Sequence, residues 1–183
     1  MENEEYPSYW SSVFIGAIIV GLIMSVLGLL SQYMTINSEP TGAPFGLPQL
    51  IGILVCLVGA IGGFFGVRHY AKENEITFPI GKGALIGLFV GLVGTLISTV
   101  ISIIWTYLID PDLGQAVYDW SIANLEAMGL TDDQLEAQMR FIPEPNSTSA
   151  MITQTGIWLA VLGILNSVSG LIGAKVFASE DED

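Results

Sequence analysis

The apolar stretch at residues 83–109 contains no charged residue between Lys82 and Asp110. As a helix rising ~1.5 Å per residue, it is long enough to cross the ~30 Å hydrocarbon core of a bilayer. The chain is 51% hydrophobic, and its mean hydropathy of +0.62 is far above that of soluble domains. The sequence therefore predicts an integral membrane protein organised around this helix.

Three more apolar stretches alternate with polar connectors along the chain. The predicted spans are residues 12–34, 48–70, 83–109 and 152–178, and with their connectors they make one integral membrane domain, residues 1–183. Tyr9, Trp10 and Tyr33 flank the first span, as aromatic side chains do at the two membrane interfaces. The predicted fold class is an all-α membrane protein, a bundle of four transmembrane helices.

Residues 110–150 form the largest region outside the predicted spans, and helical patterns occupy it. Asp112 suits the start of one helix and Gly129 its end. Thr131 followed by Gln134 has the spacing of a capping box, which predicts a second helix through about Phe141. We interpret the region as an amphipathic helical hairpin at the membrane surface, which either caps the bundle or binds a partner.

Small residues recur every three or four positions in the last three spans, so that each span carries them on one helix face. This packing seam consists of Gly59 and Gly63, then Gly83, Gly87, Gly91 and Gly94, then Gly156, Gly163 and Gly170. Alternating steps of four and three are the heptad pattern of left-handed helix packing, and small residues let helix backbones approach closely. We predict a compact bundle with no room for a central aqueous pore in the monomer.

The interiors of the spans contain no Asp, Glu, Lys, Arg or His, the residues that mark ion paths and proton relays in membranes. The polar groups that could make a functional contact are Ser98, Ser102 and Asn166, and for Asn166 a hydrogen bond between helices is favoured over a ligand contact. No catalytic residue, cofactor-binding residue or metal ligand is predicted, and His69 is interpreted as an interfacial residue. The chain is not expected to be an enzyme.

The net charge is -13, from eighteen acidic and five basic residues. The excess of acidic residues makes nucleic acid an unsuitable partner, because binding a polyanion requires clustered positive charge. Arg68, Lys72 and Lys82 lie at the connector between the second and third spans, and Lys175 lies near the end of the fourth span. Only Arg140 falls in the other compartment, so the positive-inside rule predicts cytoplasmic termini and an extracytoplasmic hairpin.

Three segments from residue 50 onward together resemble one known family. They are GVRHYAKENEITFPIGKGALIGLFVG, WTYLIDPDL and GLTDDQLEAQM, and they resemble domain of unknown function 4199, a family of uncharacterised bacterial membrane proteins. Ala71 and Lys72 depart from an Arg-Asp-like pair that is common there, and Pro79-Ile80 interrupts the family's turn. The resemblance implies four spans in the bacterial cytoplasmic (inner) membrane, and it implies no activity.

Two classes of function remain open. Tight packing without reactive groups favours a non-enzymatic scaffold or accessory subunit, whose partners are the lipid bilayer and other membrane proteins or a second copy of the chain. The Ser and Thr face of the third span favours, as the alternative, an oligomeric transporter or channel for a small neutral or apolar solute. Neither function requires a cofactor.

Overall fold

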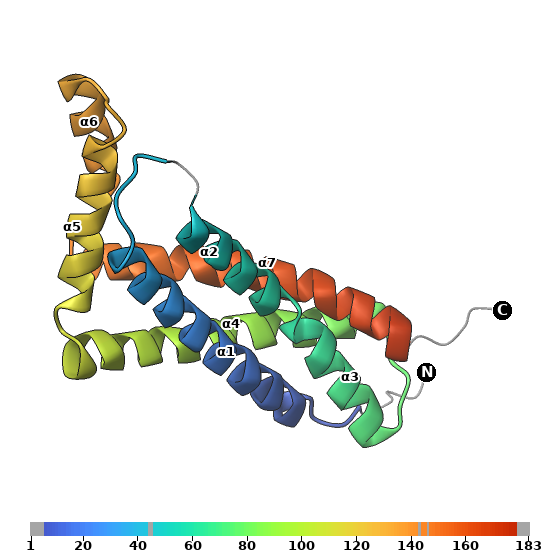
Figure 1. Ribbon diagram of the computed structural model, residues 1–183. Helices are drawn as coiled ribbons and strands as arrows, with labels where there is room; N and C mark the ends of the chain where they lie inside the picture. The colour runs from blue at the N-terminus through green and yellow to red at the C-terminus, as the bar shows by residue number, and fades with distance from the viewer. Residues whose placement is uncertain (1–5, 44–45, 143, 146, 179–183) are drawn as a thin grey trace.

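The structure is a computed structural model that describes residues 6–43, 46–142, 144–145 and 147–178. Within these ranges the chain is helical, with no strand (Figure 1). Four helical segments are long and apolar enough to cross a membrane, which confirms that part of the predicted fold class: Trp10–Ile36, Leu50–Asn74, Ile80–Ile109 and Thr148–Phe177. The acidic ends of the chain, residues 1–5 and 179–183, lie outside the described ranges.

The first and last spans are single helices, α1 (Trp10–Ile36) and α7 (Thr148–Phe177). The third is α4 (Ile80–Ile104), which continues into the π-helix η1 (Trp105–Ile109). The second differs from the single helix that its apolar pattern predicts: it is divided at Ile61 into α2 (Leu47–Ala60) and α3 (Gly62–Asn74).

Two shorter helices lie between the third and fourth spans, α5 (Leu113–Glu126) and α6 (Asp132–Met139). The predicted capping box is confirmed at α6, where Gln134 Oε1 accepts the backbone N–H of Thr131 at 3.1 Å. Asp112 stands at the N-cap of α5 but makes no side-chain cap bond. Both helices lie at the end of the bundle opposite the start of α1 and the end of α7 (Figure 1).

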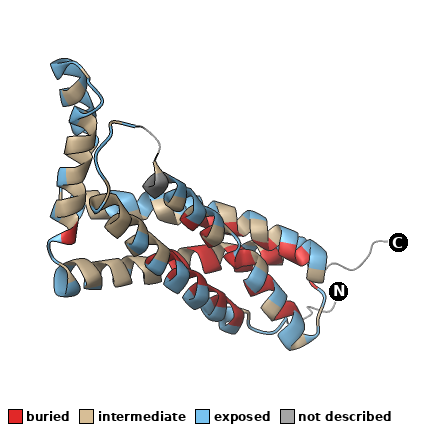
Figure 2. Ribbon diagram, viewed as in Figure 1, coloured by how far each residue is buried: buried red, intermediate tan, exposed pale blue. Residues whose placement is uncertain are grey.

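Burial is uneven along the bundle (Figure 2). One buried cluster, which includes Val67, Tyr70, Ile86 and Ala174, lies in the half that contains the start of α1 and the end of α7. We call this half the terminal half and the other the hairpin half. The terminal half is closed by a backbone bond, from the Phe78 N–H to the Ala178 carbonyl at 3.0 Å. The hairpin half contains few buried residues, so the close packing is confined to about half of the bundle.

Candidate functional site

The most extensive contact between helices is that of α4 with α7, which run antiparallel. A Cβ added at Gly83 would meet Ala174 and the backbone of Gly170, and one added at Gly87 would meet the carbonyl oxygen of Asn166. Gly91 faces the carbonyl of Leu162 in the same way. Glycine at these positions is therefore what allows the two backbones to touch.

These contacts follow steps of four on both helices, not the alternating steps of four and three that the small residues suggest. Rows of residues four apart packed on rows four apart are a different ridge arrangement from that of a heptad seam. As a result, some residues of the predicted seam do not lie at the contact between the α4 and α7 backbones. Gly94 faces Ala17 of α1, with its added Cβ 3.4 Å from that carbonyl oxygen, and Gly163 faces the side chains of Leu88 and Leu92.

Asn166 is completely buried and connects α7 to the divided second span. Its Oδ1 accepts the backbone N–H of Gly63 at 2.7 Å, and its Nδ2 donates to the carbonyls of Gly59 and Leu162, each at 2.9 Å. In a continuous helix the Gly63 N–H would donate to the Gly59 carbonyl, four residues earlier. The Asn166 carboxamide thus occupies the position of a helical hydrogen bond, which is a recognised cause of a helix break.

Three glycines in the helices of the hairpin half have no such contacts. An added Cβ at Gly28, Gly52 or Gly156 would have no atom within 4 Å. Gly156 is exposed and is not part of the close packing. A cavity of about 500 Å³ occupies the space between α1, α2, α4 and α7. The predicted close packing therefore holds in the terminal half and is wrong for this half, where the cavity lies. The prediction that the monomer has no central aqueous pore is not contradicted, because an apolar layer closes the cavity toward the terminal half.

Hydroxyl and amide side chains from three spans and the turn before α7 line this cavity. The uncharged polar residues are Ser25, Ser31, Gln32, Thr95, Ser98, Thr99, Ser102, Thr106, Ser147, Gln154 and Thr155. Met24, Trp158 and Tyr107 add apolar surface, and Glu144 is the charged residue of the lining. Of the polar positions singled out in the sequence, Ser98 and Ser102 therefore line the cavity. Asn166 does not line it and is buried in the packed terminal half.

Several of these hydroxyls donate to carbonyls of their own helix. Ser25 donates to Gly21 at 2.7 Å, Thr95 to Gly91 at 2.8 Å, and Thr106 to Ser102 at 2.9 Å. A hydroxyl has one proton and two lone pairs, so a hydroxyl that donates locally still offers its oxygen as an acceptor. The cavity wall is consequently richer in hydrogen-bond acceptors than in free donors.

The floor of the cavity is apolar. Met24 and Val55 line it, and both belong to a buried cluster with Val20 and Leu162. The Gly59 position packs against this cluster, with its added Cβ 2.9 Å from Met24 Sδ and 3.1 Å from Leu162 Cδ2. The cavity therefore ends at a hydrophobic layer, and the Asn166 hydrogen bonds lie directly beyond that layer.

The connections at the hairpin end position the upper wall. Tyr33 donates to Asp110 Oδ2 at 2.6 Å and accepts from Trp105 Nε1 at 3.0 Å, which joins α1 to both ends of the π-helix. The Asp110 N–H donates to the Trp105 carbonyl at 2.9 Å, five residues earlier, as in a π-turn. Sequence patterns show Tyr33 only as an interfacial aromatic residue and do not reveal this bond.

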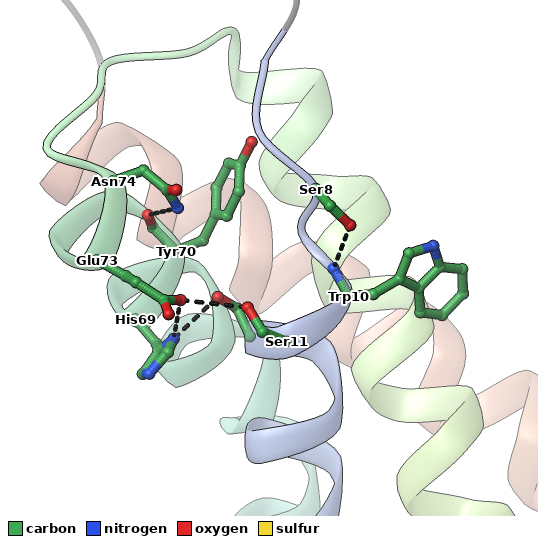
Figure 3. Close-up of polar contacts among 8 residues, drawn as sticks. Ser8, Trp10, Ser11, His69, Tyr70, Glu73 and Asn74 are labelled. Atoms are coloured by element: carbon green, nitrogen blue, oxygen red, sulfur yellow. Dashed lines mark hydrogen bonds and ion pairs between the residues drawn. The ribbon is translucent and has the colours of Figure 1, made fainter.

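A second polar cluster lies at the terminal end, where α3 meets the start of α1 (Figure 3). His69 Nδ1 lies 2.9 Å from Ser12 Oγ and 3.3 Å from Glu73 Oε2, and Ser11 Oγ donates to the same carboxylate oxygen at 3.2 Å. The residue types are those of a catalytic triad, but the geometry is not, because serine and carboxylate share one imidazole nitrogen. Ser12 is also fully buried, so a substrate has no access to its hydroxyl.

Metal ligation is not indicated in the part of the chain that the structure describes, where no group of His, Cys, Asp and Glu side chains could hold an ion. His69, interpreted from the sequence as an interfacial residue, contacts Ser12 and Glu73. Cys56, in α2, is a free thiol.

The helices and the cavity together define a class, a small helical protein with four helices suited to crossing a membrane and a cavity of mixed polar and apolar lining in one half of its bundle. Residues 16–176 match the family described as protein of unknown function (DUF4199), and the chain belongs to that family. The resemblance noted from residue 50 onward is thus confirmed and extends into α1, as far as residue 16. Neither the comparison with curated proteins nor that with solved structures finds a match.

Proposed function

We propose that the cavity binds a small uncharged solute that carries hydrogen-bond donors, and that the protein takes part in moving this solute across the membrane. The observation that supports this most directly is a cavity of about 500 Å³ in which Ser, Thr and Gln side chains from three spans stand among apolar surface, within helices that are apolar outside. Ligand pockets of this size usually combine apolar surface with a few polar groups that orient the ligand. This proposal corresponds to the alternative of the two functions that the sequence leaves open.

Because the cavity wall offers more hydrogen-bond acceptors than free donors, it favours uncharged solutes that carry donors. Polyols and simple amides bring donors without charge, whereas anions would face lone pairs and the Glu144 carboxylate at the rim. The apolar floor at Met24 and Val55 blocks passage in this conformation. Transport therefore requires α2, which is separated from α3 at Ile61, to move away from α7.

The test is solute flux into proteoliposomes, with glycerol and urea as probes and swelling followed by light scattering. Ser98→Phe places a bulky ring in the cavity, and Val100→Phe makes a comparable change on a face of α4 where Val100 is 54% exposed. We expect faster swelling than in empty liposomes, abolished by Ser98→Phe and retained in Val100→Phe. Swelling equal to that of empty liposomes for both probes would exclude transport of such solutes.

A scaffold or accessory role is the second candidate, and a specific surface favours it. Phe141 is 84% exposed just after α6, and Met128 and Met139 are more than a third exposed nearby. Exposed apolar groups outside the spans suit a protein partner, a second copy of the chain or the membrane surface. Phe141→Ser should reduce co-purification of partner proteins, while Ile80→Ser, at the opposite end of the bundle, should not.

The remaining features of the proposal follow from composition and topology. We place the protein in the bacterial cytoplasmic membrane as one integral domain, with both termini cytoplasmic and α5 and α6 outside, because basic residues gather at the terminal half. A reporter inserted after Gly129 should respond as an extracytoplasmic site. We also propose that the chain is not an enzyme, which the shared nitrogen of His69 and the burial of Ser12 support.

A further inference from the structure

A groove of about 430 Å³ runs between α1 and α3 in the terminal half, on the outside of the bundle. Its apolar wall is formed by Ile15, Ile19 and Phe65, each about half exposed. Its polar end is formed by Arg68, His69, Lys72 and Glu73. The groove is separate from the cavity of the hairpin half and has no part in the proposed transport function.

The groove is apolar at one end and charged at the other, along the axis of α3. Phe65 and Lys72 are two turns apart on α3, ~10 Å along the axis, with Phe65 toward the bilayer centre and Lys72 toward the end of the span. An occupant must therefore be apolar over its inner part and negatively charged over its outer part.

The positive charges in the groove are not neutralised by the neighbouring carboxylate. Glu73 is occupied by Ser11 and His69 on the side that faces α1 (Figure 3). Arg68 lies 5.9 Å from the centre of the Phe177 ring, an interaction that leaves its charge uncompensated. Neither Arg68 nor Lys72 makes an ion pair with any described residue.

The rest of the chain makes this concentration of positive charge unusual. The protein has five basic residues in a chain of net charge -13, and the groove contains two of them. Lys82 also lies at this end of the bundle, where its Nζ is 3.7 Å from the centre of the Tyr6 ring. Basic side chains between helices at a membrane surface are attracted to anionic headgroups.

From the shape and the charge together, we propose that this groove binds one anionic phospholipid, such as phosphatidylglycerol. The phosphate lies between Arg68 and Lys72, and an acyl chain lies along Ile15, Ile19 and Phe65. A free phosphate would leave the apolar wall uncovered, and a zwitterionic lipid would bring a cationic group toward the two basic residues.

The experiment is native mass spectrometry of the full chain released from detergent, with phosphatidylglycerol and phosphatidylcholine titrated separately. Lys72→Gln removes one positive charge from the groove, and Arg140→Gln removes one near the end of α6, where Arg140 pairs with Glu136 at 2.6 Å. We expect wild type to prefer phosphatidylglycerol. Lys72→Gln should weaken that binding about fivefold, the effect expected of one basic residue near an anionic surface, and Arg140→Gln should leave it unchanged.

Equal binding of the two lipids to wild type would overturn the proposal, as would an equal effect of Lys72→Gln and Arg140→Gln on phosphatidylglycerol. Both substituted side chains are exposed, so neither is required for the core. Arg68→Gln gives an independent comparison and should weaken phosphatidylglycerol binding to a similar degree.

Discussion

Asn166 Oδ1 accepts the backbone N–H of Gly63 at 2.7 Å, in the place that the Gly59 carbonyl would occupy in an unbroken helix. The amide group of the same side chain donates to that displaced carbonyl at 2.9 Å. One side chain of α7 thus satisfies two backbone groups at the break in the second span. Because the site is buried among apolar helices, water cannot replace these bonds, and the break depends on Asn166.

Replacement of Asn166 by Leu tests this dependence. The change keeps a similar volume but leaves the Gly63 N–H and the Gly59 carbonyl without the carboxamide, and we expect a loss of about 2 kcal/mol in the free energy of unfolding. The measurement is reversible unfolding in mixed micelles with increasing SDS. Ser167→Ala is the matched control, because that hydroxyl makes a single 3.2 Å bond to the Ala84 carbonyl and is only partly buried. Equal losses in the two variants would show that the Asn166 bridge has no special role.

Two glycines on the predicted seam should respond in opposite ways to alanine. At Gly87 the new methyl group would meet the Asn166 carbonyl of α7, and we expect destabilisation of about 2 kcal/mol, the usual cost of overpacking. At Gly156 no atom lies within 4 Å, so Gly156→Ala should be neutral or stabilise the helix by up to about 1 kcal/mol. The same SDS titration measures both, and similar destabilisation at the two sites would contradict the position of Gly156 outside the helix contacts.

The positions of the helices were predictable from the sequence because apolar length and charge-free runs determine which segments can cross a bilayer. The predicted spans agree with α1, α4 with η1, and α7 to within about four residues at each end. The capping box at Thr131 was also predictable, since it depends only on residues three positions apart. The span positions are determined by the thickness of the bilayer, and the capping box by backbone geometry over a few residues, so neither depends on contacts between distant parts of the chain.

The division of the bundle into a packed half and an open half was not predictable in the same way. Gly87 and Gly156 are both glycines within apolar helices, yet only Gly87 touches the backbone of another helix. Which glycine does so depends on how two helices cross, and residue spacing on one helix does not determine that. The break at Ile61 is likewise bridged by Asn166, which lies more than a hundred positions further along the chain.

Tyr33 connects α1 to the hairpin end and should control the order of that region. Tyr33→Phe removes the hydroxyl that donates to Asp110 and accepts from Trp105. We expect faster amide hydrogen exchange in η1 and α5 and a loss of about 1–2 kcal/mol in stability. Tyr107→Phe is the control, because Tyr107 is 48% exposed and its hydroxyl makes no hydrogen bond with any other residue that the structure describes. Unchanged exchange in Tyr33→Phe would mean that other contacts hold the π-helix.

Water access to the cavity can be tested with single cysteines in a Cys56→Ser background, since Cys56 is the only cysteine of the chain. Thiol reagents attack the thiolate, which forms in water and not in hydrocarbon. Ser102→Cys lies in the cavity wall, whereas Val100→Cys lies two positions away on α4, where the native side chain is 54% exposed outside the cavity. We expect a membrane-impermeant reagent added on the hairpin side to label Ser102→Cys about tenfold or more faster.

The direction of access gives the second part of this prediction. Because Met24, Val55 and Leu162 close the floor, reagent added from the terminal side should label Ser102→Cys no faster than Val100→Cys. Glycerol or urea bound in the cavity should slow labelling from the hairpin side, because the bound solute would keep the reagent from Ser102→Cys. Labelling at equal rates from both sides would mean that the apolar floor is open in the membrane, and the chamber would then be a continuous pore.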